Sequence, residues 1–371
     1  MPIIWSDALA ARRQDLVACS ALLRQGSRSF HLAGLLLPRR ISDEATALYA
    51  FCRRADDAID LAPGDSGVAL AGLRAQLERI YAGEPAADPM ERLLAAVVAR
   101  HAMPRVWLEA LLEGFAWDGE NRQYATLSAL HSYAARVAGS VGAMMTLLMG
   151  VRERAVIARA CELGIAMQLT NIARDVGQDA QAGRLYLPHE WLREARIDPA
   201  DWLSRPRFTP ALGGVIERLL AVADELYGRA AAAIGRLPPD CRAGIHAARL
   251  LYREIGQDLR RHGLDSLQRR AHVAAGRKTL LLAAALCAAM RPAGQLGRSS
   301  LAESEFLVEA VDACPRVAER GVGGDARRPE QGRIEWVLEL CERLQQRDRL
   351  VSASGSAAAS ETVTATAPLG V

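Results

Sequence analysis

Acidic side chains recur at helical spacing in residues 47–60, which read A-L-Y-A-F-C-R-R-A-D-D-A-I-D. Residues three or four positions apart share one face of a helix. Four polar side chains follow that spacing: Tyr49, Arg53, Asp56 and Asp60. Asp57 lies beside them, and carboxylates this close repel one another unless a cation compensates their charge. The pattern favours Mg²⁺, which carboxylates and phosphates hold; a solvated acidic face balanced by arginines is the alternative.

A second polar stripe runs through residues 164–188, G-I-A-M-Q-L-T-N-I-A-R-D-V-G-Q-D-A-Q-A-G-R-L-Y-L-P. Its members are again three or four residues apart: Gln168, Asn171, Asp175 and Asp179. The other faces are apolar, which predicts a buried helix. Buried amides and carboxylates need partners, and a metal ion with a diphosphate would supply them. Arg174 and Arg184 flank the stripe and are suited to phosphate oxygens; a polar network between helices is the alternative.

Two such stripes, opposed across one pocket, are suited to the ionisation of an allylic diphosphate. Metal ions held by carboxylates act as Lewis acids and neutralise the charge of the leaving diphosphate. The resulting carbocation must be kept from water, which an apolar cavity in a helical bundle achieves. Aromatic faces also stabilise a cation, and the candidates are Phe30, Tyr49, Phe51 and Tyr133. The two stripes therefore predict transfer of a prenyl group.

The rest of the chain predicts the helices that position these stripes. Half of the 371 residues are hydrophobic, and long segments carry apolar residues at helical spacing, without runs of alternating β-branched residues. Prolines interrupt the pattern at Pro38, Pro63, 85–89, Pro104, Pro199, 206–210 and 238–239. We therefore expect an all-α fold, a single-domain helical bundle with a central apolar cavity.

Composition divides the chain into three parts. Residues 10–292 are expected to form the working domain. Residues 293–350 form a variable extension, in which a stretch rich in Gly, Arg and Pro precedes one predicted amphipathic helix. Residues 351–371 are rich in Ser, Ala and Thr with almost no charge, so we predict a disordered low-complexity tail.

The overall composition argues against several classes of protein. The 46 basic and 43 acidic residues are too balanced to indicate nucleic-acid binding. Seven dispersed cysteines without a C-x-x-C pair are typical of free thiols in a reducing compartment. No signal peptide is apparent, and the longest apolar stretch, 280–290, is shorter than the ~20 residues of a membrane span. We expect a cytoplasmic protein whose membrane association, if any, is peripheral.

Several longer motifs resemble those of the squalene and phytoene synthases, most closely the bacterial phytoene synthases. The most specific are Q-L-T-N-I-A-R-D-V-G-Q-D at 168–179, followed by G-R-L-Y-L-P, and Y-A-A-R-V-A-G-S-V-G at 133–142. G-S-R-S-F at 26–30 is similar to a phosphate-binding segment of that family, and residues 251–270 with Lys278 are similar to its late helix. The resemblance covers about residues 20–290 and implies the isoprenoid-synthase type of bundle.

Carried over by position, the resemblance implies roles for individual residues. Magnesium ligands would be Asp56, Asp57, Asp60, Asn171, Asp175 and Asp179. Diphosphate contacts would come from Ser27, Ser29, Arg53, Gln168, Asn171, Arg174, Arg184, Tyr252 and Arg269. Tyr49 and Tyr133 would lie near the reacting carbons, so that the catalytic set is Asp56, Asp60, Asp175, Asp179, Tyr49 and Tyr133.

The reaction implied by the resemblance is head-to-head condensation of two geranylgeranyl diphosphates, through prephytoene diphosphate, to phytoene. It would use Mg²⁺, or alternatively Mn²⁺, and no NADPH, since the chain has no G-x-G-x-x-G dinucleotide motif. The apolar product suggests peripheral membrane contact for its release, while the oligomeric state stays open. A C30 enzyme that uses farnesyl diphosphate is the alternative of the same fold, and a non-catalytic helical scaffold is the alternative of another class.

Overall fold

The computed structural model describes residues 13–20, 36–60, 66–297 and 299–313, and every regular element within them is a helix. The all-α prediction is therefore confirmed. The main helices are α3 (Arg39–Asp60), α4 (Ser66–Ala82), α5 (Pro89–His101), α6 (Arg105–Gly119), α7 (Leu127–Ala134), α8 (Ser140–Leu148), α9 (Arg154–Gln181), α10 (His189–Glu194), α11 (Pro199–Ser204), α12 (Pro210–Ile234), α13 (Pro239–Arg261), α14 (Ala275–Ala289) and α15 (Glu305–Glu309). Short turns named η1 (Ala135–Gly139), η2 (Ala302–Ser304) and η3 (Ala310–Ala313) join some of them.

Prolines and capping side chains set where many of these helices begin. Helices α3 and α6 begin one residue after a proline, and α5, α11, α12 and α13 carry proline in the first turn, where its missing N–H costs nothing. Asp88 accepts a hydrogen bond from the Glu91 N–H (3.1 Å) at α5, and Thr209 accepts one from the Leu212 N–H (3.2 Å) at α12. Within the described residues, the helix breaks predicted at prolines are confirmed.

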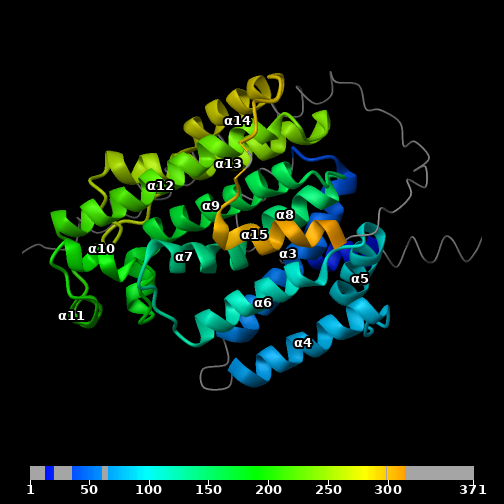
Figure 1. Cartoon of the computed structure of the whole chain (residues 1–371), viewed down its shortest axis with the longest axis horizontal. Coiled ribbons are helices and arrows are strands. Elements are labelled where there is room, and N and C mark those ends of the chain that lie inside the picture. Colours follow the sequence, from blue (N-terminus) through cyan, green and yellow to red (C-terminus); the bar gives the residue numbers. More distant parts are fainter. Residues whose placement is uncertain (1–12, 21–35, 61–65, 298, 314–371) are drawn as a thin grey trace, which may run out of the picture.

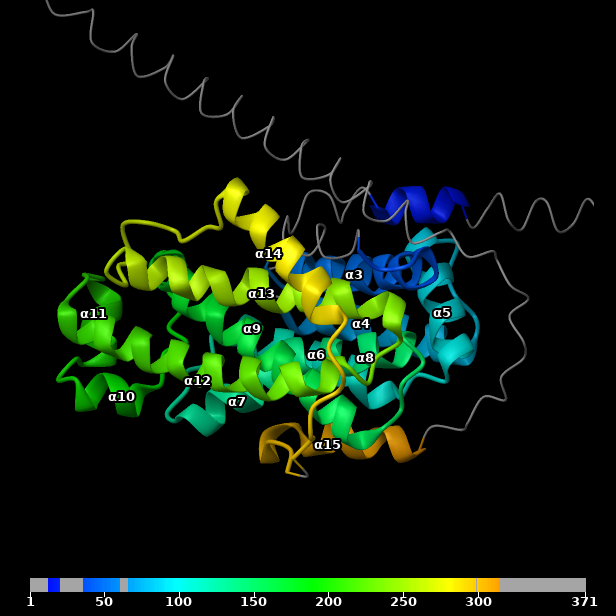
Figure 2. The same cartoon turned by 90° about the horizontal axis from the view of Figure 1, so that it is seen from above.

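Helix α9 is the central helix of the bundle (Figure 1). It packs against η1, α8, α12 and α13, and most of its side chains are buried. Figure 2 shows α10 and α11 at one end of the bundle and α5 at the other. The buried helix predicted for the second polar stripe is thus confirmed, and one of its ends carries the acidic residues.

The Tyr133–Gly142 motif does not fold as one regular α-helix. Helix α7 passes into the π-helical turn η1 before α8 begins, a change that periodicity did not reveal. At Gly142 a Cβ atom would lie 2.2 Å from the Ala160 carbonyl oxygen, and at Gly164 one would lie 2.1 Å from that of Ala138. These glycines therefore allow the η1–α8 segment and α9 to touch backbone to backbone.

The segment 299–313 packs on the outer side of the central helices. Trp107 of α6 donates a hydrogen bond through Nε1 to the Leu307 carbonyl oxygen over 2.8 Å, and Leu307 itself is fully buried. Arg154 at the start of α9 forms an ion pair with Glu305 at 3.0 Å. Among the described helices, none has the length and apolar content that crossing a membrane requires.

Candidate active site

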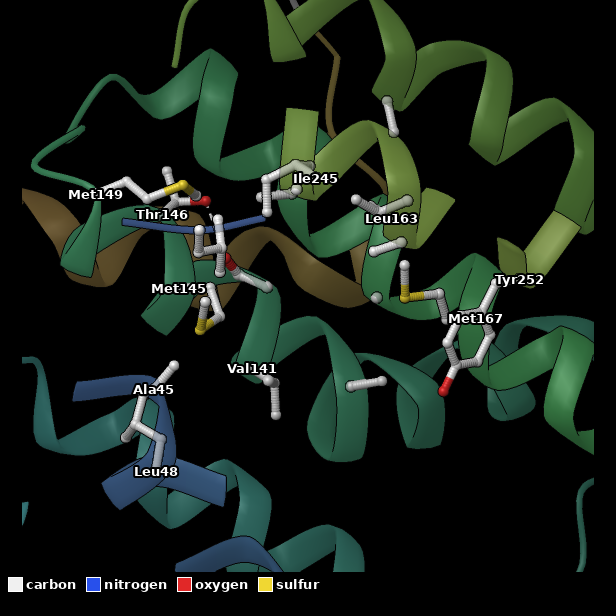
Figure 3. Close-up of a pocket in the computed structure, with 18 of the residues that line it drawn as sticks. Ala45, Leu48, Val141, Met145, Thr146, Met149, Leu163, Met167, Ile245 and Tyr252 are labelled. Atoms are coloured by element: carbon white, nitrogen blue, oxygen red, sulfur yellow. Dashed lines mark hydrogen bonds between the residues drawn. The ribbon is translucent and has the colours of Figure 1, made fainter. Parts of the chain in front are cut away.

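A largely apolar cavity of about 320 Å³ lies between α3, η1–α8, α9, α12 and α13. Figure 3 shows Met145 of α8 and Met149, the residue after α8, on one part of its wall and Leu163 and Met167 from α9 on another. Ile245 of α13 also lines it, and most of the other lining side chains are aliphatic. The predicted central apolar cavity is therefore present, and its wall is suited to shielding a reactive hydrocarbon from water.

The cavity wall turns polar toward the end at which Tyr252 and Met167 lie (Figure 3). Gln168 and Asn171 continue α9 beyond Met167, and Tyr49 joins the wall from α3. Asn171 donates through Nδ2 to Gln168 Oε1 over 3.4 Å, but its own Oδ1 is buried without a hydrogen-bond partner. Four predicted site residues from three helices thus line one cavity. The buried Oδ1 of Asn171 could accept a hydrogen bond or bind a cation there.

The first acidic cluster lies at the end of α3. Arg53 binds Asp57 through Nε at 3.1 Å and Nη2 at 2.6 Å, and its Nη1 lies 3.5 Å from Asp56. Arg54 turns away to Asp88, at 2.7 Å and 3.1 Å. The sequence placed Arg53 on the stripe with the aspartates, and in the structure Arg53, not Arg54, lies with them. The predictions for Ser27, Ser29 and the Asp60 side chain lie outside the described residues.

In the second cluster, two arginines hold Asp175. Arg174 Nε donates to Asp175 Oδ1 over 2.8 Å, and Arg270 donates to both carboxylate oxygens over 2.8 Å and 3.2 Å. Burial favours a higher pKa for Asp175, but the hydrogen bonds from Arg174 and Arg270 outweigh it and lower the pKa below the usual value. Asp175 is therefore a charged group with its charge already compensated.

Asp179, one turn further along α9, has the opposite electrostatic environment. Burial and the nearby charge of Asp175 raise its pKa to about 7, although Arg184 and Arg174 act in the other direction. A carboxylate with this pKa holds its charge poorly at neutral pH, because no sufficient positive charge lies near it. A divalent cation would supply that charge.

A third acidic residue, Asp118 of α6, belongs to the same region. Its carboxylate accepts hydrogen bonds from the hydroxyls of Tyr186 (2.7 Å) and Tyr133 (2.9 Å). The rings of Tyr133 and Tyr186 stack with centroids 5.3 Å apart, and Tyr124 packs against both. Burial raises the pKa of Asp118 to about 6, against the tyrosine hydrogen bonds that lower it.

Asp118 also connects the two acidic clusters. The charge of Asp56 raises the pKa of Asp118, and the charge of Asp118 raises that of Asp179. Side chains from α3, α6 and α9 therefore share one electrostatic site beside the polar end of the cavity. Sequence reasoning missed Asp118 because it lies outside both stripes and has no second acid three or four residues away.

The late basic residues are arranged differently from the expectation. Arg269, predicted to contact diphosphate, binds Asp258 at 2.9 Å, whereas its neighbour Arg270 reaches Asp175. The only indication in the sequence was that a second arginine, Arg270, directly follows the predicted Arg269. The predicted role of Arg269 stays a prediction, and Arg270 becomes a further candidate for a phosphate contact.

The oxygen ligands of this region fit a hard cation. Carboxylate and amide oxygens are the ligands that Mg²⁺ prefers, and Asn171 Oδ1 and Asp179 are a buried unpartnered oxygen and an undercompensated carboxylate. In the part of the chain that the structure describes, however, no three Asp, Glu, His or Cys side chains gather closely enough to hold a metal ion. Arginines hold Asp57 and Asp175 instead, so metal binding would require these pairs to rearrange.

The profile of the squalene/phytoene synthases matches residues 23–277, which include all the described site residues. The chain belongs to the squalene/phytoene synthase family. A phytoene synthase from Rhodobacter capsulatus is 53% identical over 271 residues, 72% of this chain and 80% of that protein. One from Cereibacter sphaeroides is 44% identical over 352 residues, 91% of this chain and 96% of that protein.

The fold of this family is also the fold observed here. The crystal structure of a dehydrosqualene synthase in complex with ligand superimposes with a TM-score of 0.66 at 32% identity. The superposition covers 74% of this chain and 96% of that one. The predicted isoprenoid-synthase type of helical bundle is confirmed by this likeness.

Proposed function

We propose that this protein is a Mg²⁺-dependent phytoene synthase, which joins two geranylgeranyl diphosphates head to head with loss of both diphosphates. The observation that carries the proposal is the similarity to phytoene synthases at 53% and 44% identity over most of their lengths. The apolar cavity that ends at amide and tyrosine side chains supports it chemically. Mn²⁺ is an alternative cation, and a phytoene synthase needs no NADPH, because its last cation loses a proton without being reduced.

In this proposal the aspartates bind the metal ion and the arginines bind the phosphate oxygens of the diphosphate. Asp179, Asp175 and Asn171 on α9, with Asp56 and Asp57 on α3, would hold Mg²⁺, which supplies Lewis-acid assistance to the departing diphosphate. Arg174 and Arg270 now lie on Asp175 and are close enough to exchange that carboxylate for phosphate oxygens.

The cavity and the tyrosines would act on the hydrocarbon part of the substrates. The aliphatic side chains of α8, α9 and α13 bind the prenyl chains and exclude water from the carbocations. Asp118 keeps the Tyr133 and Tyr186 rings in one fixed orientation through their hydroxyls. These two rings are not among the residues that line the cavity, whereas Tyr49 lines it and can stabilise a passing cation there.

A C30 product from farnesyl diphosphate is the second candidate, favoured by the likeness to a dehydrosqualene synthase structure at 32% identity. The two candidates differ in the length of the prenyl chain that the cavity accepts. The identities to phytoene synthases are higher, and they favour the longer substrate.

The experiment is a product assay with geranylgeranyl and farnesyl diphosphate supplied separately, each with Mg²⁺, with Mn²⁺ or with EDTA, and with or without NADPH. We expect a C40 hydrocarbon from geranylgeranyl diphosphate, its loss in EDTA, and no effect of NADPH. Product from farnesyl diphosphate alone would contradict the phytoene assignment. Unchanged product in EDTA would contradict the metal assignment.

A further inference from the structure

Helix α14 presents an apolar stripe to the outside of the molecule. Its exposed side chains include Leu280, Ala283, Ala284 and Cys287, and Met290 follows at its end. This spacing of three and four residues places them on one face. Leu280 is 62% exposed and Met290 79%, and they are two of the four large hydrophobic side chains that are exposed among the described residues.

The opposite face of α14 packs on the wall of the substrate cavity. Leu282 and Ala285 are fully buried against Ala247 of α13 and Leu36. Other residues of α13, Ile245 and Tyr252, line the cavity on the inner side. In Figure 1 and Figure 2, α14 lies outside α13, and no other described helix covers it. One helix thus separates the apolar cavity from the apolar outer stripe.

A second cavity, of about 330 Å³, opens between α13 and α14 beside this stripe. Its lining combines leucines with three arginines: Leu250, Arg253, Glu254, Gln257, Arg261, Arg277 and Leu281. Each arginine side chain is about half exposed. Arg261 and Arg277 bind the single carboxylate of the lining, the buried Glu254, at 2.8 Å and 3.0 Å, and Arg253 binds Asp224 of α12 at 2.7 Å. The three arginines of the lining thus outnumber its single carboxylate and lie next to apolar surface, a combination that fits a phosphodiester on a hydrocarbon chain.

The charge of the surrounding sequence agrees with that occupant. Residues 266–302 contain no aspartate or glutamate but hold five arginines and the only lysine, Lys278. Arg291 is exposed just beyond the apolar stripe. An amphipathic helix with basic residues at its edges binds anionic bilayers through its apolar face and its charge together.

We propose that α14 and the arginine-lined cavity between α13 and α14 form a docking surface for an anionic phospholipid bilayer. The helix would lie in the interface, with Leu280 and Met290 among the acyl chains and a lipid phosphate at Arg253, Arg261 and Arg277. Docking would bring the cavity wall next to lipid, where an apolar hydrocarbon product can leave. The test of docking does not depend on the proposed function, because binding is measured without substrate.

The full-length chain is sedimented with vesicles of phosphatidylcholine, with or without phosphatidylglycerol. We expect binding only with the anionic lipid, and a fall of about tenfold or more in affinity for Leu280→Glu. Val68→Glu on α4 is the matched control, since Val68 is 66% exposed, and it should bind as the unaltered chain does. Arg291→Glu should also weaken binding about tenfold, whereas Arg74→Glu on the exposed face of α4 should not.

Equal binding by Leu280→Glu and Val68→Glu would overturn the proposal, as would binding that ignores phosphatidylglycerol. If the unaltered chain does not bind vesicles but is a dimer by light scattering, and Leu280→Glu makes it a monomer, the stripe would be an interface with a second copy of the chain. If inorganic phosphate, at a concentration equal to that of the lipid, displaces all of the protein from the vesicles, the arginines would instead bind a free anion. Product formation in detergent should stay unchanged in all four variants, and its absence in the unaltered chain would count against the proposed function alone.

Discussion

Asp179→Asn and Asp175→Asn are expected to change the stability of the metal-free protein in opposite directions. Asp179 has a pKa of about 7 in the folded protein against an ordinary 3.8, so its contribution to stability is full below pH 4 and is lost as the pH rises through 7. Asparagine removes that loss. Asp175 has a lowered pKa and hydrogen bonds from Arg174 and Arg270, so its replacement leaves two guanidinium groups without their partner.

The magnitudes follow from these shifts and contacts. At ~1.4 kcal/mol for each pKa unit, the shift of Asp179 sets an upper limit of about 4 kcal/mol. Screening by solvent reduces this, and we expect a gain of about 1–2 kcal/mol at pH 8. For Asp175→Asn, loss of charge-assisted hydrogen bonds should cost about 2–3 kcal/mol. These values correspond to changes in melting temperature of roughly +3 °C and −5 °C.

The assay is thermal unfolding in EDTA at pH 5 and at pH 8, repeated with Mg²⁺ and inorganic diphosphate. The gain of Asp179→Asn should be larger at pH 8 than at pH 5. Both variants should lose product formation and any stabilisation by Mg²⁺ with diphosphate. A gain that does not depend on pH, or equal destabilisation by the two substitutions, would refute the electrostatic account of this site.

Three further predictions concern other parts of the chain. Asp118→Asn should lower kcat at least tenfold while circular dichroism and melting temperature change little, because the tyrosine hydroxyls lose a charged acceptor within an isosteric side chain; an unaltered kcat would remove Asp118 from the site. Gly142→Ala should destabilise by about 2 kcal/mol or more through its contact with Ala160, whereas Gly214→Ala, with open space around its Cβ, should be neutral or stabilising in denaturant titrations; equal effects would contradict the close helix approach. Deletion of residues 351–371 should leave product formation and melting temperature nearly unchanged, and a large loss of either would show that this segment is structural.

The helices and the two acidic stripes were predictable because they depend on local spacing. Asn171 and Gln168 are three residues apart, and the helix alone brings them to one cavity wall. The apolar periodicity of α9 indicated burial for the same reason. Proline positions gave the helix boundaries, since proline removes a backbone donor wherever it stands.

The remaining features depend on contacts between distant segments. Asp118 and Tyr186 are 68 residues apart, and nothing in the sequence around either indicates the other. The choice of Arg270 over Arg269 as the partner of Asp175 depends on how the turn after α13 approaches α9. The π-helical turn at Ala135–Gly139 leaves apolar spacing nearly unchanged over so few residues, and therefore periodicity could not reveal it.

The arginine pair on Asp175 has a consequence for the order in which ligands bind. A cation that takes this carboxylate alone must displace both arginines, of which Arg270 is exposed but Arg174 is largely buried. The buried guanidinium group would then lack a partner, so Mg²⁺ by itself should bind weakly. A diphosphate that takes the guanidinium groups alone leaves Asp175 uncompensated and meets the same penalty. Together the two ligands exchange every broken ion pair for a new one. Their binding should therefore be positively cooperative, and each should increase the affinity for the other by the same factor.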